Sequence, residues 1–199
     1  MPVLFFSPTS PYARKARVLL AEKGMSDTVR LQPSMPFERP ADLIAANPLS
    51  KVPALVLDDG STLFDSPVVC EYLDSLAEPR LIPRDGPARW QALRRQAQAD
   101  GMLDAGILML LEGRRPEGER SPGWVAQQWQ TVERALDAFE AEAGALGPDV
   151  GIGEITLGCA LGWLDFRMDD RNWRAGRDAL AAWEKTFATR PSMQATRPS

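Results

Sequence analysis

The segment Ser10-Pro11-Tyr12-Ala13 holds residues that can stabilise an anion at the start of a helix. Serine is a preferred N-cap, and proline suits the first helical position. The first turn of a helix has free backbone N–H groups and the positive end of the helix dipole, so it favours an anion such as a thiolate. The segment has no cysteine of its own, but it could still stabilise a thiolate that arrives on a ligand. Among the hydroxyls of this turn Ser10 ranks ahead of Ser7 and Thr9, although a plain N-cap is the commoner role for such a serine.

Two further motifs could hold the rest of such a ligand. Val52-Pro53 precedes an apolar segment, and a cis proline there would turn the Val52 backbone outward to pair with an extended peptide. A trans proline that opens a strand is the alternative. Asp65-Ser66 opens a helical pattern, where a carboxylate, a hydroxyl and free N–H groups could bind an amino-acid end, unless the pair is an ordinary helix cap. Lys51 could reach a ligand carboxylate, or it could simply be solvated.

The elements that position these motifs fall into two groups. Up to about residue 78 the pattern predicts the order β-α-β-α-β-β-α, with strands at 2–6, 28–32, 54–57 and 61–64. Residues 79–87 form a proline-rich linker. Beyond it the pattern is helical, with segments at 88–111, 122–144, 152–168 and 176–188. We therefore predict an α/β domain over 1–78 and an all-α domain over 88–199.

Composition excludes several classes of function. The 199-residue chain is 44% apolar with a net charge of −4, which offers no basic surface for nucleic acid and ample core for folding. It has no histidine, which removes Ser-His-Asp and Cys-His catalysis and most zinc sites. No run suits a membrane span or a secretory signal, so we expect a cytoplasmic protein. Cys70 and Cys159 are predicted to be free, buried core thiols, and no metal is expected.

Together these motifs resemble the glutathione S-transferase superfamily. The matching stretches are 7–15, 47–55 and 63–66, and the order of helices behind them also fits, so the resemblance covers the whole chain. The turn at Ser10 is similar to that of a glutaredoxin, Cys-Pro-Tyr-Cys, with both cysteines replaced. The resemblance implies a thioredoxin-like N-terminal domain followed by a helical-bundle C-terminal domain, and a bacterial, cytosolic member of the serine- and cysteine-type classes.

The resemblance also implies roles for individual residues. Ser10 would donate a hydrogen bond to the glutathione sulfur, the Val52 backbone beside Pro53 would pair with the cysteinyl part, and Asp65 and Ser66 would hold the γ-glutamyl end. Lys51 would approach a ligand carboxylate. Glutathione would be the co-substrate, with no other cofactor. A small hydrophobic electrophile would be the second substrate, and the assembly would be a two-fold homodimer.

The helical half would line the electrophile pocket. The candidates there are Met102, Leu103, Gly106, Met109, Leu110, Trp124 and Trp163. The alternatives to a transferase are glutathione-dependent reduction of disulfides or peroxides, a non-catalytic ligand binder, and an interaction module.

Two further positions bear on the fold. Arg14 is predicted to be structural or at the rim of the site. The stretch Gly151-Ile152-Gly153-Glu154 departs from the family's capping box, because Gly151 has no hydroxyl.

Overall fold

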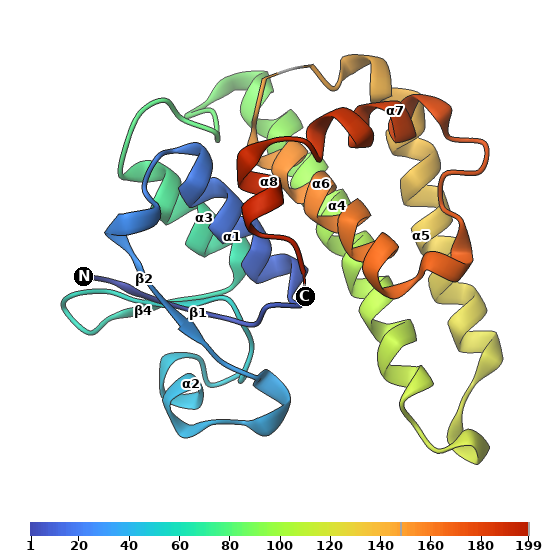
Figure 1. Cartoon of the computed structure of the whole chain (residues 1–199), viewed down its shortest axis with the longest axis horizontal. Coiled ribbons are helices and arrows are strands. Elements are labelled where there is room, and N and C mark those ends of the chain that lie inside the picture. The colour runs from blue at the N-terminus through green and yellow to red at the C-terminus, as the bar shows by residue number, and fades with distance from the viewer. Residues whose placement is uncertain (148, 199) are drawn as a thin grey trace.

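The N-terminal half is a four-stranded sheet with helices on both faces, as a computed structural model that describes residues 1–147 and 149–198 shows (Figure 1). The strand order is β2-β1-β3-β4; β1 runs parallel to β2, and the other pairs are antiparallel. Side chains alternate along β1: Leu4 joins the core under α1 and α3, whereas Phe5 joins the core under α2. The strands are β1 (Val3–Phe6), β2 (Arg30–Pro33), β3 (Ala54–Val56) and β4 (Thr62–Leu63), and the helices are α1 (Pro11–Glu22), α2 (Ala41–Ala46) and α3 (Ser66–Ser75).

The predicted thioredoxin-like order is confirmed, with one shift. The second strand begins at Arg30 and not at Thr28, because Ser26–Thr28 forms the short 3₁₀ turn η1. Helix α1 ends as predicted at Lys23-Gly24, where Gly24 takes φ +65°, a left-handed conformation that suits glycine. A second 3₁₀ turn, η2 (Pro36–Glu38), lies between β2 and α2.

The second half is helical throughout and is built around α6, which is buried along most of its length. Helix α4 begins at Gly86, inside the predicted linker, since Pro87 suits a first turn. Sequence reasoning missed α8, because a five-residue helix is too short to show an apolar period. The helices are α4 (Gly86–Gly113), α5 (Pro122–Glu142), α6 (Ile152–Arg167), α7 (Asp178–Phe187) and α8 (Pro191–Ala195), with 3₁₀ turns η3 (Glu117–Glu119), η4 (Ala143–Ala145) and η5 (Asp169–Arg171).

The start of α6 shows why glycine stands where the family has a capping hydroxyl. A Cβ at Gly151 would lie 2.8 Å from Oε2 of Glu154, so a larger residue would displace that carboxylate. Glu154 forms an ion pair with Arg95 of α4 at 2.7 Å. The first N–H of the helix, that of Ile152, donates to the carbonyl of Leu81 at 3.0 Å. The linker therefore caps α6 in place of a side chain.

Buried ion pairs join the two halves. Lys15 of α1 binds Asp100 of α4 through both carboxylate oxygens, at 2.8 and 2.7 Å, and the lysine side chain is only 1% exposed. Near the linker, Lys23 binds Asp74 at 2.8 Å, and the Asp74 carboxylate accepts the backbone N–H groups of Leu81 and Ile82. These pairs fix α4 and the linker against the sheet domain.

No helix within the described residues combines the length and the apolar character that crossing a membrane requires. The division into domains at 1–78, 79–87 and 88–199 stays a prediction.

Candidate active site

Ser10 is the N-cap of α1, and its side chain faces a small crevice between the two halves. Its backbone is extended (φ −80°, ψ 118°), and its Oγ accepts the N–H of Ala13 at 3.2 Å. A capping hydroxyl accepts through a lone pair, so its proton remains free to be donated. The crevice beside it is too narrow to hold a water molecule, and it is lined by Pro8, Thr9, Ser10, Pro11, Arg14, Cys159, Trp163 and Pro198. The N-cap role and a role toward a ligand are therefore compatible.

The two rival hydroxyls of the same turn are placed differently. Ser7 is buried, and its Oγ lies 3.4 Å from Oγ1 of Thr9. The Ser7 carbonyl accepts the N–H of Ser10 at 3.1 Å, which closes the turn. Thr9 lines the crevice together with Ser10. Ser10 remains the candidate whose hydroxyl stands at the first free N–H groups of α1.

The hydroxyl of Tyr12 donates to the carboxylate of Asp104 on α4, across the junction of the two halves. Burial, and then this hydrogen bond, raise the pKa of Tyr12 far above its usual value, so the phenol is protonated at neutral pH. Its proton is also committed to Asp104. Tyr12 thus positions α1 against α4, and its hydroxyl proton is not free for a ligand.

The peptide bond between Val52 and Pro53 is cis, as the sequence analysis predicted. The loop before it is held by Asn47, which is 1% exposed. The Asn47 side chain donates to the carbonyl of Lys51 at 2.9 Å and accepts the N–H of Leu49 at 3.0 Å. Val52 itself is buried, and Lys51 is exposed beside it. The loop therefore presents a fixed backbone with a cation at its edge.

The strand register places the three motifs, at Ser10, Val52-Pro53 and Asp65-Ser66, at the same end of the sheet. Phe5 of β1 pairs with Ala54 of β3, so Pro53 lies level with the end of β1, where the turn to Ser10 begins. Leu55 pairs with Leu63 of the antiparallel β4, so the chain after Leu63 runs back toward the same end. That continuation leads to Asp65 and Ser66.

Asp65 and Ser66 open α3 without an ordinary side-chain cap. The Asp65 side chain makes no capping hydrogen bond and is exposed, whereas Ser66 is 3% exposed. The Asp65 charge contributes to the raised pKa of Tyr12, which shows that its carboxylate lies near the start of α1. The simple cap interpretation of Asp65 is therefore wrong, and its carboxylate is free for a ligand cation.

Both cysteines are buried, as predicted, and neither can serve as the nucleophile at neutral pH. Burial raises the pKa of Cys70 to about 12 and that of Cys159 to about 11. Arg14 is structural: it donates to the carbonyl of Met193 at 3.0 Å and to Thr196 at 3.4 Å, which ties α1 to the C-terminal segment. Among the described residues no cluster of acidic or cysteine side chains could hold a metal ion.

The prediction for the electrophile pocket was partly wrong. Met102, Leu103 and Met109 are 1–5% exposed and belong to the core between α4, α5 and α6. Gly106 is covered by Trp163, whose ring would lie 2.7 Å from a Cβ there. Leu110 is partly buried against the same core, and Trp124 is 42% exposed.

Trp163 lines the narrow crevice beside Ser10, and its role at an electrophile pocket stays a prediction. Sequence reasoning missed Tyr12, Asp104 and Lys15 as residues that join the halves there. The apolar period of α4 indicates its buried face but not which residues of other elements meet it.

Two family models match the chain. The glutathione S-transferase N-terminal domain covers residues 9–76, and the glutathione S-transferase C-terminal domain covers residues 122–185. The chain belongs to the glutathione S-transferase family. A solved family member from Pseudomonas fluorescens Pf-5, with bound glutathione, is 44% identical, with a TM-score of 0.97 over all of both chains.

Two other comparisons bear on this family assignment. A Pseudomonas fluorescens Pf-5 structure with bound S-(propanoic acid)-glutathione is 43% identical, with a TM-score of 0.92 over all of both chains. The uncharacterized GST-like protein YibF of Escherichia coli strain K12 is 34% identical over 196 residues, which is 96% of each chain. The family and its two-part fold are thus common to relatives that span this chain from end to end.

Proposed function

We propose that this chain is a glutathione transferase of the serine type. It binds glutathione with the sulfur at Ser10 and activates the thiolate for attack on a small hydrophobic electrophile. The observation that carries the proposal is the Ser10 hydroxyl, which caps α1 through its oxygen and keeps its proton for a sulfur. A relative of 44% identity was solved with bound glutathione, which supports glutathione as the ligand.

Activation requires the site to favour the thiolate over the thiol. A free thiol has a pKa near ~8.5, and each unit of depression requires ~1.4 kcal/mol of preference for the anion. A hydrogen bond to a charged group contributes ~1.5–3 kcal/mol, and a helix N-terminus adds ~0.3–1 kcal/mol. The Ser10 hydroxyl and the start of α1 together would lower the thiol pKa by about one to three units. A depression of about two units or more would leave bound glutathione largely ionised at neutral pH.

The rest of glutathione would be held by the two motifs at the same end of the sheet. The Val52 backbone, exposed by the cis bond to Pro53, would pair with the cysteinyl N–H and C=O groups. The Asp65 carboxylate would bind the γ-glutamyl ammonium, and Ser66 with the first N–H groups of α3 would bind its carboxylate. Lys51 would reach the other end of the peptide.

In the reaction, the thiolate attacks an electrophilic carbon and forms a thioether. The displaced group leaves with its bonding electrons, or a proton from water completes an addition. A relative of 43% identity binds S-(propanoic acid)-glutathione, which is a thioether of this kind. That ligand supports transfer to carbon over the reduction of disulfides, which would use two thiols.

We further propose a cytoplasmic homodimer. Apolar side chains on the N-terminal half and on the start of α4 are exposed: Leu49 62%, Val68 46%, Leu76 49% and Trp90 68%. We propose that a two-fold interface covers these side chains, since a contiguous exposed apolar patch marks a protein contact. Two unpaired thiols are in keeping with a reducing compartment.

Two assays with glutathione test the proposed activity. We expect the purified chain to conjugate chlorodinitrobenzene, with loss of that activity in Ser10→Ala, and to reduce hydroxyethyl disulfide poorly. Efficient disulfide reduction without conjugation would replace the transferase with a reductase. Glutathione binding without either reaction, and with no fall in the thiol pKa, would make the chain a binder only.

A further inference from the structure

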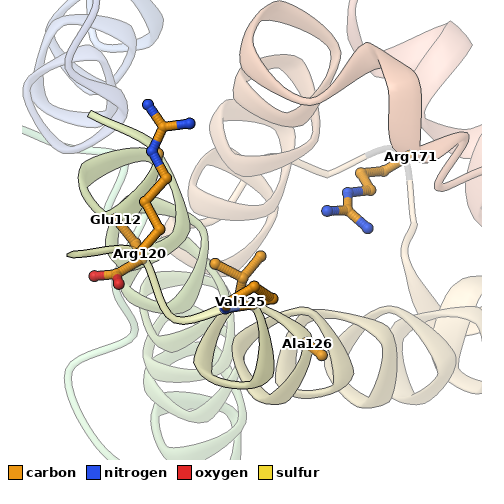
Figure 2. Close-up of a pocket in the computed structure, with 7 residues that line it drawn as sticks. Glu112, Arg120, Val125, Ala126 and Arg171 are labelled. Atoms are coloured by element: carbon orange, nitrogen blue, oxygen red, sulfur yellow. The ribbon is translucent and has the colours of Figure 1, made fainter. Parts of the chain in front are cut away.

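A second cavity lies at the far end of the α4–α5 hairpin, away from the crevice at Ser10. Its volume is about 340 Å³, within the range of small-molecule sites. Arg120 and Arg171 stand on opposite sides of Val125 and Ala126 (Figure 2). The lining residues are Glu112, Gly113, Arg120, Pro122, Val125, Ala126 and Arg171.

The two arginines have their guanidinium forks available. Nε of Arg120 donates to the carbonyl of Arg115 at 2.8 Å, which anchors the base of the fork. Arg171 lies over the ring of Trp129, 5.3 Å from its centre, and its Nε is 3.7 Å from a carboxylate oxygen of Asp170. Within the part of the chain that the structure describes, the terminal nitrogens of neither guanidinium make a hydrogen bond. Arginine forks of this kind match a carboxylate through two parallel bonds.

The acidic groups nearby are already partnered. Oε1 of Glu112 accepts the backbone N–H of Ser121 at 2.7 Å, and Oε2 lies 3.9 Å from Nε of Arg115. Asp170 is the ion-pair partner of Arg171. The cavity therefore offers two guanidinium groups beside an apolar floor made by Pro122, Val125 and Ala126, while the Glu112 carboxylate in its lining is engaged by the Ser121 N–H and lies near Arg115.

We propose that this cavity binds a small organic acid, with its apolar body on the α5 floor and its carboxylate between Arg120 and Arg171. The site goes beyond the proposed glutathione chemistry and uses none of its residues. Gly113, in the cavity wall, stands seven residues after Gly106, which packs against Trp163 of the Ser10 crevice. Seven residues are two helical turns, so the cavity lies on the same side of α4, about 10 Å further along.

The acid could come from two sources. An electrophile with a long, flexible body could react at Ser10 while its own carboxylate lies between the arginines. A free organic acid could instead occupy the cavity without being consumed. The ligand chemistry is the same in both cases, and kinetics separates them.

The binding test uses 2-naphthoate and its neutral isostere 2-naphthamide, with isothermal titration calorimetry as the measurement. We expect wild type to bind 2-naphthoate at least about tenfold more tightly than 2-naphthamide. Arg120→Gln and Arg171→Gln should each remove most of this preference. Ala126→Phe should weaken both ligands, because the ring fills the floor. Arg134→Gln is the matched control: it removes a positive charge from an exposed site on α5 outside the cavity and should bind as wild type does.

The source test compares the conjugation of 6-(4-chloro-3-nitrobenzamido)hexanoate, in which a flexible six-carbon acid separates the carboxylate from the reacting ring, with that of its primary amide. If the kcat/KM ratio of acid to amide falls in both arginine variants, and 2-naphthoate competes with the hexanoate, the carboxylate belongs to the electrophile. If the ratio is unchanged while 2-naphthoate still binds, the acid is a separate ligand.

Equal binding of naphthoate and naphthamide by wild type would overturn the proposal. A preference that survives in Arg120→Gln and Arg171→Gln would overturn it as well. Glutathione binding, measured on the same samples, reports on the proposed function separately, because Ser10, Val52 and Asp65 are untouched.

Discussion

Replacing Ser10 by alanine separates the two roles of its hydroxyl. The oxygen accepts the Ala13 N–H at 3.2 Å, so the variant loses a helix cap worth ~1 kcal/mol of folding stability. In a chain of this size that loss lowers Tm by about 2–4 °C. The variant also loses a donor to the thiolate, worth ~1.5–3 kcal/mol, which raises the pKa of bound glutathione by about one to two units.

Ultraviolet absorbance of the thiolate, titrated against pH with saturating glutathione, measures this shift directly. At the pH where glutathione on wild type is half ionised, we expect only about a tenth or less of the glutathione bound to Ser10→Ala to be ionised. Ser121→Ala is the matched control, since its Oγ caps α5 by accepting the N–H of Trp124 at 3.3 Å. It should lose comparable stability and leave the thiolate unchanged. A Ser10→Ala protein that ionises glutathione as wild type does would refute the role of this hydroxyl.

Three further outcomes test the site and its support. Asp65→Asn should weaken glutathione binding about tenfold or more without altering the thiol pKa, and should change stability by less than about 0.5 kcal/mol, because the carboxylate is exposed and caps nothing. Asp100→Asn should cost ~3–5 kcal/mol in denaturant unfolding, because it leaves the buried Lys15 ammonium unpaired. Glu22→Gln should lower Tm at pH 7, with a deficit that narrows below about pH 4.

The pH dependence expected for Glu22→Gln follows from the ion pair of Glu22 with the Arg190 guanidinium. Its two hydrogen bonds, at 2.9 and 2.8 Å, hold the pKa of Glu22 below the usual value. The Glu22–Arg190 pair therefore stabilises the fold at pH values above the pKa that Glu22 has in the unfolded chain. This stabilisation is lost as the pH falls and the Glu22 carboxylate is protonated. A Tm deficit of Glu22→Gln that grows in acid would contradict this effect of the ion pair. Unchanged stability in Asp100→Asn would contradict the prediction for the buried Lys15 ammonium. For Asp65, a shifted thiol pKa with intact binding would refute its placement at the γ-glutamyl end.

Local chemistry in the sequence predicted the sheet domain well. Pro11 and Gly24 mark the two ends of α1, and the Asp59-Gly60 turn marks the hairpin, because caps and turns depend on a few adjacent residues. The cis bond before Pro53 followed from the resemblance to thioredoxin-like domains, because the local sequence alone fitted a trans proline equally well. These features place the three motifs along the chain, and the strand register then brings them to one end of the sheet.

Contacts between distant residues could not be predicted in this way. Tyr12 and Asp104, 92 positions apart, meet only because α1 packs beside α4. The pocket prediction placed Met102 and Met109 at the ligand, since an apolar period identifies the face that avoids water but not which partner covers it. The arginine cavity depends on Arg171 returning to the α4–α5 hairpin after α6, which no local pattern shows.

A crystal structure of the chain soaked with glutathione tests the central claim most directly. The account predicts the glutathione sulfur within hydrogen-bond distance of Oγ of Ser10, with the peptide along Val52 and the γ-glutamyl group at Asp65. A tripeptide that is absent at saturating concentration, or bound with its sulfur turned away from the first turn of α1, would contradict it.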